Sequence, residues 1–345
     1  MQNRPAITLQ DSVRWKFLPS AHLTYTPITN LNLRFSYAKT AVRPSLMDNS
    51  RFSRYNTNLG RMQVNLGLES SVIDNYDLKL EWFPGAGDII SVGGFYKYFD
   101  KPAEFYAVNE VSGTDNLYVY TNNSNWGKIK GLEFEVRKSL GFIYPASILK
   151  EITISGNLTL LKSEVESRVL RYKTDKEGKQ YSFYEYMKYK RPLYGQVPVV
   201  VNGGLSYVGK HIGMNLVYNY MGYKTSITGV DPNLVEYERP RSQLDAQVSY
   251  RFYRNKAQFK FNMSNLTDSP YQFYINDAST FEIKNANPPV NSEWNDVYKY
   301  KFGFTDKFEE GYVDSSKGIG QQIGDRQTLT RYLGRSFSLS LSYNF

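Results

Sequence analysis

Cysteine is absent from this sequence of 345 residues, and histidine occurs only twice, as His22 and His211. The lack of thiols excludes disulfides, thiolate metal sites and cysteine nucleophiles. The sequence pattern places His22 on a strand and His211 in a tight turn, so neither a histidine-based metal site nor a serine–histidine–aspartate triad is indicated. We therefore expect no catalytic residues, no metal and no cofactor, and the sequence does not predict an enzyme.

Long apolar runs, basic blocks and an export signal are also missing. No apolar stretch approaches the roughly eighteen residues of a membrane helix, which excludes helical spans only, because a barrel strand exposes every second side chain to lipid. The 42 Lys and Arg residues are scattered among 33 Asp and Glu residues, so nucleic acid is not an expected partner. The net charge of +9 leaves open an attraction to anionic lipopolysaccharide or an anionic ligand. Residues 1–10 lack a basic segment followed by an apolar one, so we expect an N-terminal portion to be missing.

What the sequence does contain is aromatic residues and two-residue alternation. Tyrosine occurs 30 times and phenylalanine 20 times, which favours pleated strands. At the end of the chain Phe337, Leu339 and Leu341 alternate with serines, so that one face of the strand is apolar and the other polar. Ten earlier segments of roughly ten residues, the length of a tilted membrane strand, show the same pattern. They lie near residues 13–26, 31–37, 77–82, 88–99, 132–137, 152–160, 196–208, 212–223, 244–252 and 257–265.

The connections between these eleven segments alternate in length. The short ones are 27–30, 84–88, 141–150, 209–211 and 253–256, and the long ones are 44–72, 101–126, 164–195, 224–240 and 267–328. Short turns on one side and long loops on the other are typical of outer-membrane barrels, whose long loops lie outside the cell. The sequence therefore predicts an all-β transmembrane antiparallel β-barrel. Because single-chain bacterial barrels have even strand numbers, we expect further strands upstream.

Several short stretches, in order along the chain, resemble the barrel of TonB-dependent outer-membrane receptors. They are Phe17–Ser20 with Leu31–Tyr37 and Ala38–Ser45, then Asn75–Pro84, Gly94–Asp100, Ile129–Glu135, Met263–Asp268, and Gly334–Phe337 leading into Tyr343–Phe345. The resemblance implies that residues 11–345 form the C-terminal half, about eleven strands, of a twenty-two-stranded barrel, with residues 1–10 the remnant of an outer loop. It also implies a plug domain and an N-terminal box for the TonB energy-transducing complex, and this sequence contains neither.

The function implied by the resemblance is energy-dependent uptake of a scarce nutrient, such as a siderophore or glycan, across the outer membrane of a Gram-negative cell. A surface lipoprotein assists some members of the family. Two other interpretations stay open: a self-contained porin or barrel enzyme of about twelve strands, and a soluble all-β carbohydrate-binding module. A plug domain upstream would favour the receptor, and a signal peptide directly before residue 1 would favour the small barrel.

Three groups of residues are candidates for functional contacts. The C-terminal strand resembles the signal that the barrel-assembly machinery reads by strand addition, through Leu339, Leu341, Tyr343 and Phe345, which would also face lipid. Charged residues on the polar face are predicted to contact the plug or line the lumen: Arg34, Lys79, Glu81, Glu133, Arg137 and Arg251. Aromatic and polar residues in the long loops can stack on a sugar, chelate or peptide, or simply pack together. These are Tyr118, Tyr120, Asn122 and Trp126; Tyr181, Tyr184, Tyr186, Tyr189 and Arg191; and Trp294, Tyr298 and Tyr300.

Overall fold

A computed structural model describes most of the chain. The described residues are 15–49, 53–57, 61–65, 68–108, 117–121, 124–145, 148–174, 178, 180–186, 189–229, 235–275, 281–283, 292–293, 298–300, 312–314, 321–323 and 325–344. The predicted outer-loop remnant, residues 1–10, lies outside these ranges, as do Asn122, Trp294 and Phe345.

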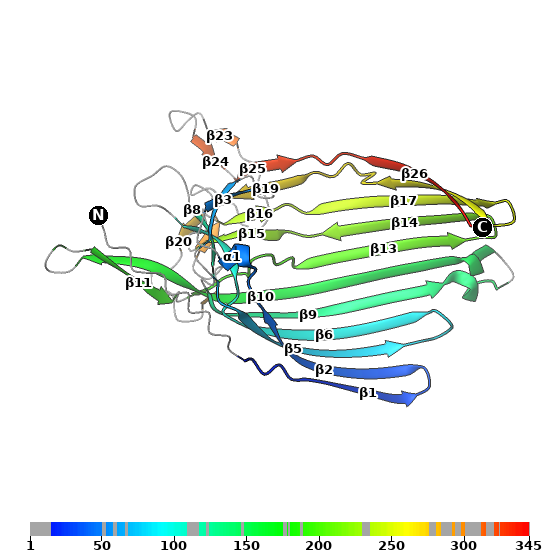
Figure 1. Cartoon of the computed structure of the whole chain (residues 1–345), viewed down its shortest axis with the longest axis horizontal. Coiled ribbons are helices and arrows are strands. Elements are labelled where there is room, and N and C mark those ends of the chain that lie inside the picture. Colours follow the sequence, from blue (N-terminus) through cyan, green and yellow to red (C-terminus); the bar gives the residue numbers. More distant parts are fainter. Residues whose placement is uncertain are drawn as a thin grey trace.

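The dominant element is one large antiparallel sheet, here called the main sheet, whose strands follow chain order (Figure 1). Its path contains eleven strands, as the alternation predicts. They are β1 (Ser20–Ile28), β2 (Leu31–Val42), β5 (Ser71–Trp82), β6 (Ile89–Asp100), β9 (Ser124–Ser139), β10 (Ile152–Thr174), β13 (Val199–Val208), β14 (Ile212–Met221), β17 (Arg241–Phe252), β18 (Ala257–Ser264) and β26 (Ser336–Tyr343). The path ends at β1 and β26, so the sheet is an open part of a barrel wall, and β11 (Gln180–Tyr186) pairs with the far end of β10.

The apolar side chains of the main sheet are not sealed in a core. In β26, Phe337, Leu339 and Leu341 are 57%, 65% and 71% exposed. Side chains of adjacent residues point to opposite faces of a strand, so these residues share one face with their register partners Met263, Phe261 and Phe259 of β18. The main sheet thus has an apolar face and a polar face, as a barrel wall between lipid and water requires.

A second sheet, here called the loop sheet, forms at one end of the main sheet from segments of four long connections. Its eight strands, in spatial order, are β25 (Arg326–Arg331), β19 (Tyr271–Ile275), β16 (Glu236–Glu238), β15 (Lys224–Gly229), β7 (Glu104–Val108), β8 (Leu117–Thr121), β4 (Arg61–Asn65) and β3 (Ser53–Asn56). Buried apolar clusters lie here, one around Phe105 and Ile227 and another around Tyr237 and Tyr274. These strands lie in segments that the sequence predicts as loops.

Several short elements complete the described structure. They are α1 (Leu46–Asn49), the 3-10 turns Leu140–Phe142 and Ile148–Glu151, and the strand pairs β12 (Tyr189–Lys190) with β21 (Ser292–Glu293), β20 (Phe281–Ile283) with β22 (Tyr298–Tyr300), and β23 (Tyr312–Asp314) with β24 (Gln321–Ile323). Within the described ranges no helix has the length and apolar character needed to cross a membrane.

Two predicted boundaries need correction. The first strand begins at Ser20 rather than near residue 13, and the residue before it, Pro19, has no N–H to donate to a strand ladder. The loop predicted from residue 164 begins later, because β10 continues to Thr174 and pairs there with β11. The alternation that identified β10 is imposed by lipid on one face, so it does not mark the part of the strand beyond the membrane.

Asp88 closes the short turn between β5 and β6 and ties it to β9. Its carboxylate accepts hydrogen bonds from Lys138 Nζ at 2.6 Å and from the Ser139 backbone N–H at 2.9 Å. The hydrogen bond from Lys138, followed by that from Ser139, lowers the pKa of Asp88 below its ordinary value. Stability from this carboxylate is therefore present above its unfolded pKa, about 3.9, and is lost as the pH falls through the lower folded value.

We expect Asp88→Asn to have a lower melting temperature than the parent at neutral pH. Below about pH 3.9 the melting temperatures of the two proteins should approach each other. Thermal unfolding in detergent, followed by circular dichroism at several pH values, measures both effects. Asp268→Asn, at a turn near the opposite end of the sheet, is the control. An Asp88→Asn deficit that persists unchanged at low pH would contradict the assignment.

Candidate functional site

The polar face of the main sheet carries a connected set of charges. Arg34 Nε lies 2.8 Å from Glu81 Oε2, and Lys79 Nζ lies 3.5 Å from Glu81 Oε1 and 3.0 Å from Glu135 Oε2. Lys79 of β5 reaches Glu135 of β9 across β6, where its register partner is Gly93. A Cβ at Gly93 would lie in ordinary contact with Lys79 Cγ, at 3.5 Å, so the lysine side chain crosses β6 over the space that Gly93 leaves open. The structure thus joins three of the predicted lumen residues in one network.

The other predicted lumen residues have different surroundings. Glu133 and Arg137 are exposed on the polar face of β9. Arg251 holds the turn between β13 and β14, because its Nη2 donates to the Gly209 carbonyl at 2.8 Å and its backbone N–H donates to the His211 carbonyl at 2.7 Å. Contact between these six residues and a plug stays a prediction.

Most of the predicted ligand residues belong to different strands of the loop region. The backbones of Tyr118 and Tyr120 lie in β8, and the other tyrosines are spread over β11, β12 and β22. Their side chains fall outside the described part of the structure. Trp126, in β9, has Lys128 Nζ at 4.3 Å from its ring centroid. Ligand contact by these residues stays a prediction.

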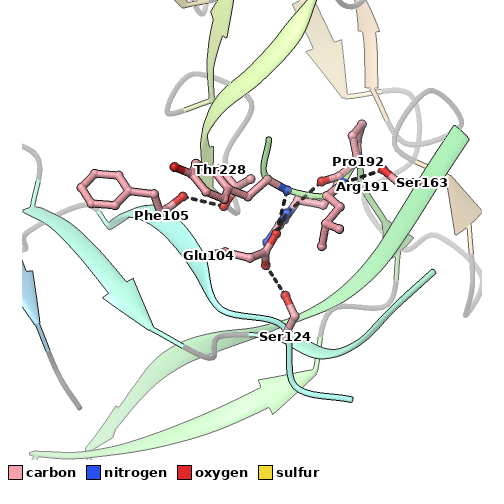
Figure 2. Close-up of polar contacts among 9 residues, drawn as sticks. Glu104, Phe105, Ser124, Ser163, Arg191, Pro192 and Thr228 are labelled. Carbon is pink, nitrogen blue, oxygen red and sulfur yellow. Dashed lines mark hydrogen bonds and ion pairs between the residues drawn. The ribbon is translucent and has the colours of Figure 1, made fainter. Parts of the chain in front are cut away.

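Arg191 lies in a buried ion pair rather than on an open loop surface (Figure 2). Its Nη1 and Nη2 atoms lie 2.9 and 2.7 Å from the two carboxylate oxygens of Glu104, and both side chains are at most 1% exposed. The Ser124 hydroxyl and the Tyr194 backbone N–H also donate to this carboxylate. Arg191 additionally forms a β-bridge with Val165 of β10. The pair therefore fastens the loop sheet, through β7, to the adjacent ends of β9 and β10.

A polar pocket of about 500 Å³ opens in the loop sheet, here called the loop-sheet pocket. Its lining combines five charged residues with aromatic and amide groups: Asp48, Arg54, Lys224, Glu238, Arg331, Asn56, Gln63, Ser226, Phe105, Tyr194, Tyr271 and Phe273. No residue named as a ligand candidate from the sequence lines it.

The charged side chains that line the loop-sheet pocket are only partly neutralised by ion pairs. Lys224 Nζ lies 3.2 Å from Glu238 Oε2, and Arg54 Nη2 lies 3.5 Å from Asp48 Oδ1. The second carboxylate oxygen of Glu238 and Nε of Arg54 are buried without a hydrogen-bond partner among the described residues. A buried polar atom without a partner costs about 1–3 kcal/mol. The pocket thus combines these two ion pairs with a third cation, Arg331, beside aromatic rings.

Sequence patterns gave no signal for this pocket, because its charged residues come from three separate connections. Asp48 and Arg54 follow β2, Lys224 and Glu238 lie between β14 and β17, and Arg331 precedes β26. The only available indication was that all three connections are long. As for metals, no group of three or more potential His, Cys, Asp or Glu ligands occurs within the described ranges.

Comparison with known proteins places this geometry in a family. The model of the TonB dependent receptor-like β-barrel family matches residues 3–266. Among solved structures, the ferric enterobactin receptor PfeA of Pseudomonas aeruginosa is 14% identical with a TM-score of 0.50, over 95% of this chain and 40% of that chain. The copper transporter OprC is 11% identical with a TM-score of 0.52, over 94% of this chain and 39% of that chain. At such identities the likeness concerns the fold alone, and no curated protein matches.

Proposed function

Because the chain belongs to the TonB-dependent receptor-like β-barrel family, we propose that it forms part of the wall of an outer-membrane receptor for a scarce nutrient. Uptake would be driven by the TonB complex, and the nutrient would be a siderophore, a glycan or a similar compound. The chain spans about 40% of the length of the solved structures it resembles, so transport is the activity of a larger barrel. A plug, the barrel-assembly machinery and a surface lipoprotein are proposed partners on the same basis.

The loop-sheet pocket is the observation that carries this proposal. It is lined mostly by residues of the loop sheet. The loop sheet forms at the end of the main sheet that faces away from the short turns (Figure 1). In a barrel of this kind the long connections face the outside of the cell, where a nutrient first arrives. A pocket lined by three cations, two carboxylates and aromatic rings suits capture of a polar ligand there.

The open edges of the main sheet support a larger barrel. β1 and β26 are the first and last of eleven strands that alternate in direction, so both run the same way. Antiparallel closure therefore needs an odd number of additional strands, because bare edges are not tolerated in lipid. A second copy of this sheet would place β26 parallel to β1 of its partner, and so would not supply an antiparallel seam.

Uptake of candidate nutrients in cells with and without a functional TonB complex tests the proposal. We expect uptake to require both the chain and the complex. Uptake that depends on the chain but not on TonB would overturn the proposal in favour of a passive pore.

The loop-sheet pocket is tested by Glu238→Gln and Arg331→Ala. Loss of one hydrogen bond to a charged group is worth about 1.5–3 kcal/mol, so we expect each variant to raise the Kd for a transported ligand by about tenfold or more. Arg326→Ala, on the same strand as Arg331 but outside the pocket, is the matched control. Equal Kd values for Arg331→Ala and Arg326→Ala, measured by calorimetry, would remove the pocket from ligand capture.

A further inference from the structure

A groove of about 710 Å³ crosses the apolar face of the main sheet over β2, β5, β6, β9 and β10. One row of register partners forms its floor: Phe35, Leu78, Gly94, Leu132 and Leu160. Gly94 is the one member of this row without a side chain, so the apolar face is hollow there. A Cβ at Gly94 would lie 3.6 Å from Leu132 Cδ2, an ordinary contact distance, so the backbone can accept a larger residue.

The next row toward the loop sheet changes from aromatic to cationic. It contains Tyr37, Tyr76, Tyr96, Lys130 and Lys162 as successive register partners. The rings of Tyr37 and Tyr76 are 5.0 Å apart, and those of Tyr76 and Tyr96 are 6.2 Å apart. Tyrosines at this depth mark the membrane interface, because their rings sit at the headgroup level. Lys130 and Lys162, directly opposite each other, therefore lie at the headgroup level at the upper edge of the groove.

One row further out, the same face holds Lys39, Asp74, Tyr98, Lys128 and Glu164. Lys39 Nζ is 3.3 Å from Asp74, which also accepts a hydrogen bond from the Tyr37 hydroxyl at 2.8 Å. Across the two rows, four lysines face two carboxylates, and both carboxylates belong to the outer row. The rim next to the groove is thus positively charged, while the floor is apolar.

We propose that this groove is a binding site for one lipopolysaccharide molecule of the outer leaflet. An acyl chain lies in the hollow above Gly94, and a phosphate of the acylated sugar contacts Lys130 and Lys162. This arrangement matches an amphiphile, because a free anion would gain nothing from the apolar floor and an uncharged lipid would gain nothing from the lysines. The inference rests on the membrane placement given above, but it concerns the outer wall and not the transport route.

Binding is measured by native mass spectrometry on the chain purified from outer membranes, with purified lipopolysaccharide or phosphatidylglycerol as the probe. A basic residue near an anionic membrane surface contributes about fivefold in affinity. Lys130→Glu reverses the charge at this position, so we expect it to weaken lipopolysaccharide binding by about tenfold or more. Gly94→Leu fills the hollow and is expected to weaken it comparably. Lys97→Glu, next to Tyr96 on the polar face, and Gly94→Ala are the matched controls and should bind like the parent.

Each outcome decides for or against the site. Selective loss in Lys130→Glu and Gly94→Leu supports it. Equal losses in Lys130→Glu and Lys97→Glu would show general charge attraction, and equal affinity for phosphatidylglycerol would show an unselective anionic-lipid surface; both overturn the proposal. Lys130→Gln, which removes the positive charge without reversing it, replaces Lys130→Glu if that variant does not assemble. Because binding is read on purified protein, failure of TonB-dependent uptake would leave this result unaffected.

Discussion

Glutamine in place of Glu104 is expected to destabilise the loop sheet by about 3–5 kcal/mol, the usual cost of breaking a buried ion pair. The carboxylate of Glu104 accepts from both terminal nitrogens of Arg191, from Ser124 and from the Tyr194 backbone. Its removal leaves the Arg191 guanidinium buried without its counter-charge. The loop sheet would then open before the main sheet unfolds, because this pair connects the two.

Hydrogen exchange of β7 and β15, compared with β13 and β14, measures this local opening. We expect Glu104→Gln and Arg191→Met each to accelerate exchange in β7 and β15 while leaving β13 and β14 protected. The double variant Glu104→Leu with Arg191→Met should recover part of the protection that each single variant loses in β7 and β15, because no unpaired charge remains buried.

The exposed ion pair between Lys101 and Glu69 provides the control. These side chains are 48% and 71% exposed at 2.6 Å, and an exposed pair contributes about 0–1 kcal/mol. Glu69→Gln should therefore leave exchange of the loop sheet close to that of the parent. If Glu104→Gln behaved like Glu69→Gln, the buried pair would not be what fastens the loop sheet.

The main sheet was predictable from the sequence because each of its strands carries its own evidence. Alternation between lipid and water is a local signal, visible in Leu31–Tyr37 or Ser336–Tyr343 without knowledge of the rest of the chain. The register follows from the same alternation and from short turns, since a slip of one residue would turn every apolar side chain to the polar face.

The loop sheet was not predictable for the opposite reason. Its strands are short, and two of its pairings are parallel and join distant segments: Thr228 pairs with Tyr106, and Val64 pairs with Val119. Arg191 illustrates the consequence. Among loop tyrosines it is typical of a ligand contact, but its carboxylate partner lies 87 residues earlier in the chain, and only the folded loop sheet brings the two together. The loop-sheet pocket was not predicted for the same reason, because its charged residues come from separate connections that meet only in the folded chain.

Arginine in place of Phe134 is expected to be the most damaging single change in the main sheet. Phe134 lies in β9 on the apolar face, in the row of Leu33, Leu80, Val92 and Leu158, below the tyrosine row that marks the interface. An arginine on the lipid face near the bilayer midplane costs about 2–4 kcal/mol, whereas the same residue in a lumen is tolerated.

The matched control is Glu133→Arg, one residue earlier on the same strand, whose side chain points to the polar face. We expect Phe134→Arg to reduce the amount of chain assembled in outer membranes severalfold and to lower its unfolding midpoint in urea, while Glu133→Arg retains both. Both variants add an arginine to one strand, and Glu133→Arg makes the larger change in charge, so a greater loss in Phe134→Arg points to the lipid face rather than to charge. Equal behaviour of the two variants would mean that lipid does not contact the apolar face, and the membrane placement of the whole sheet would fail with it.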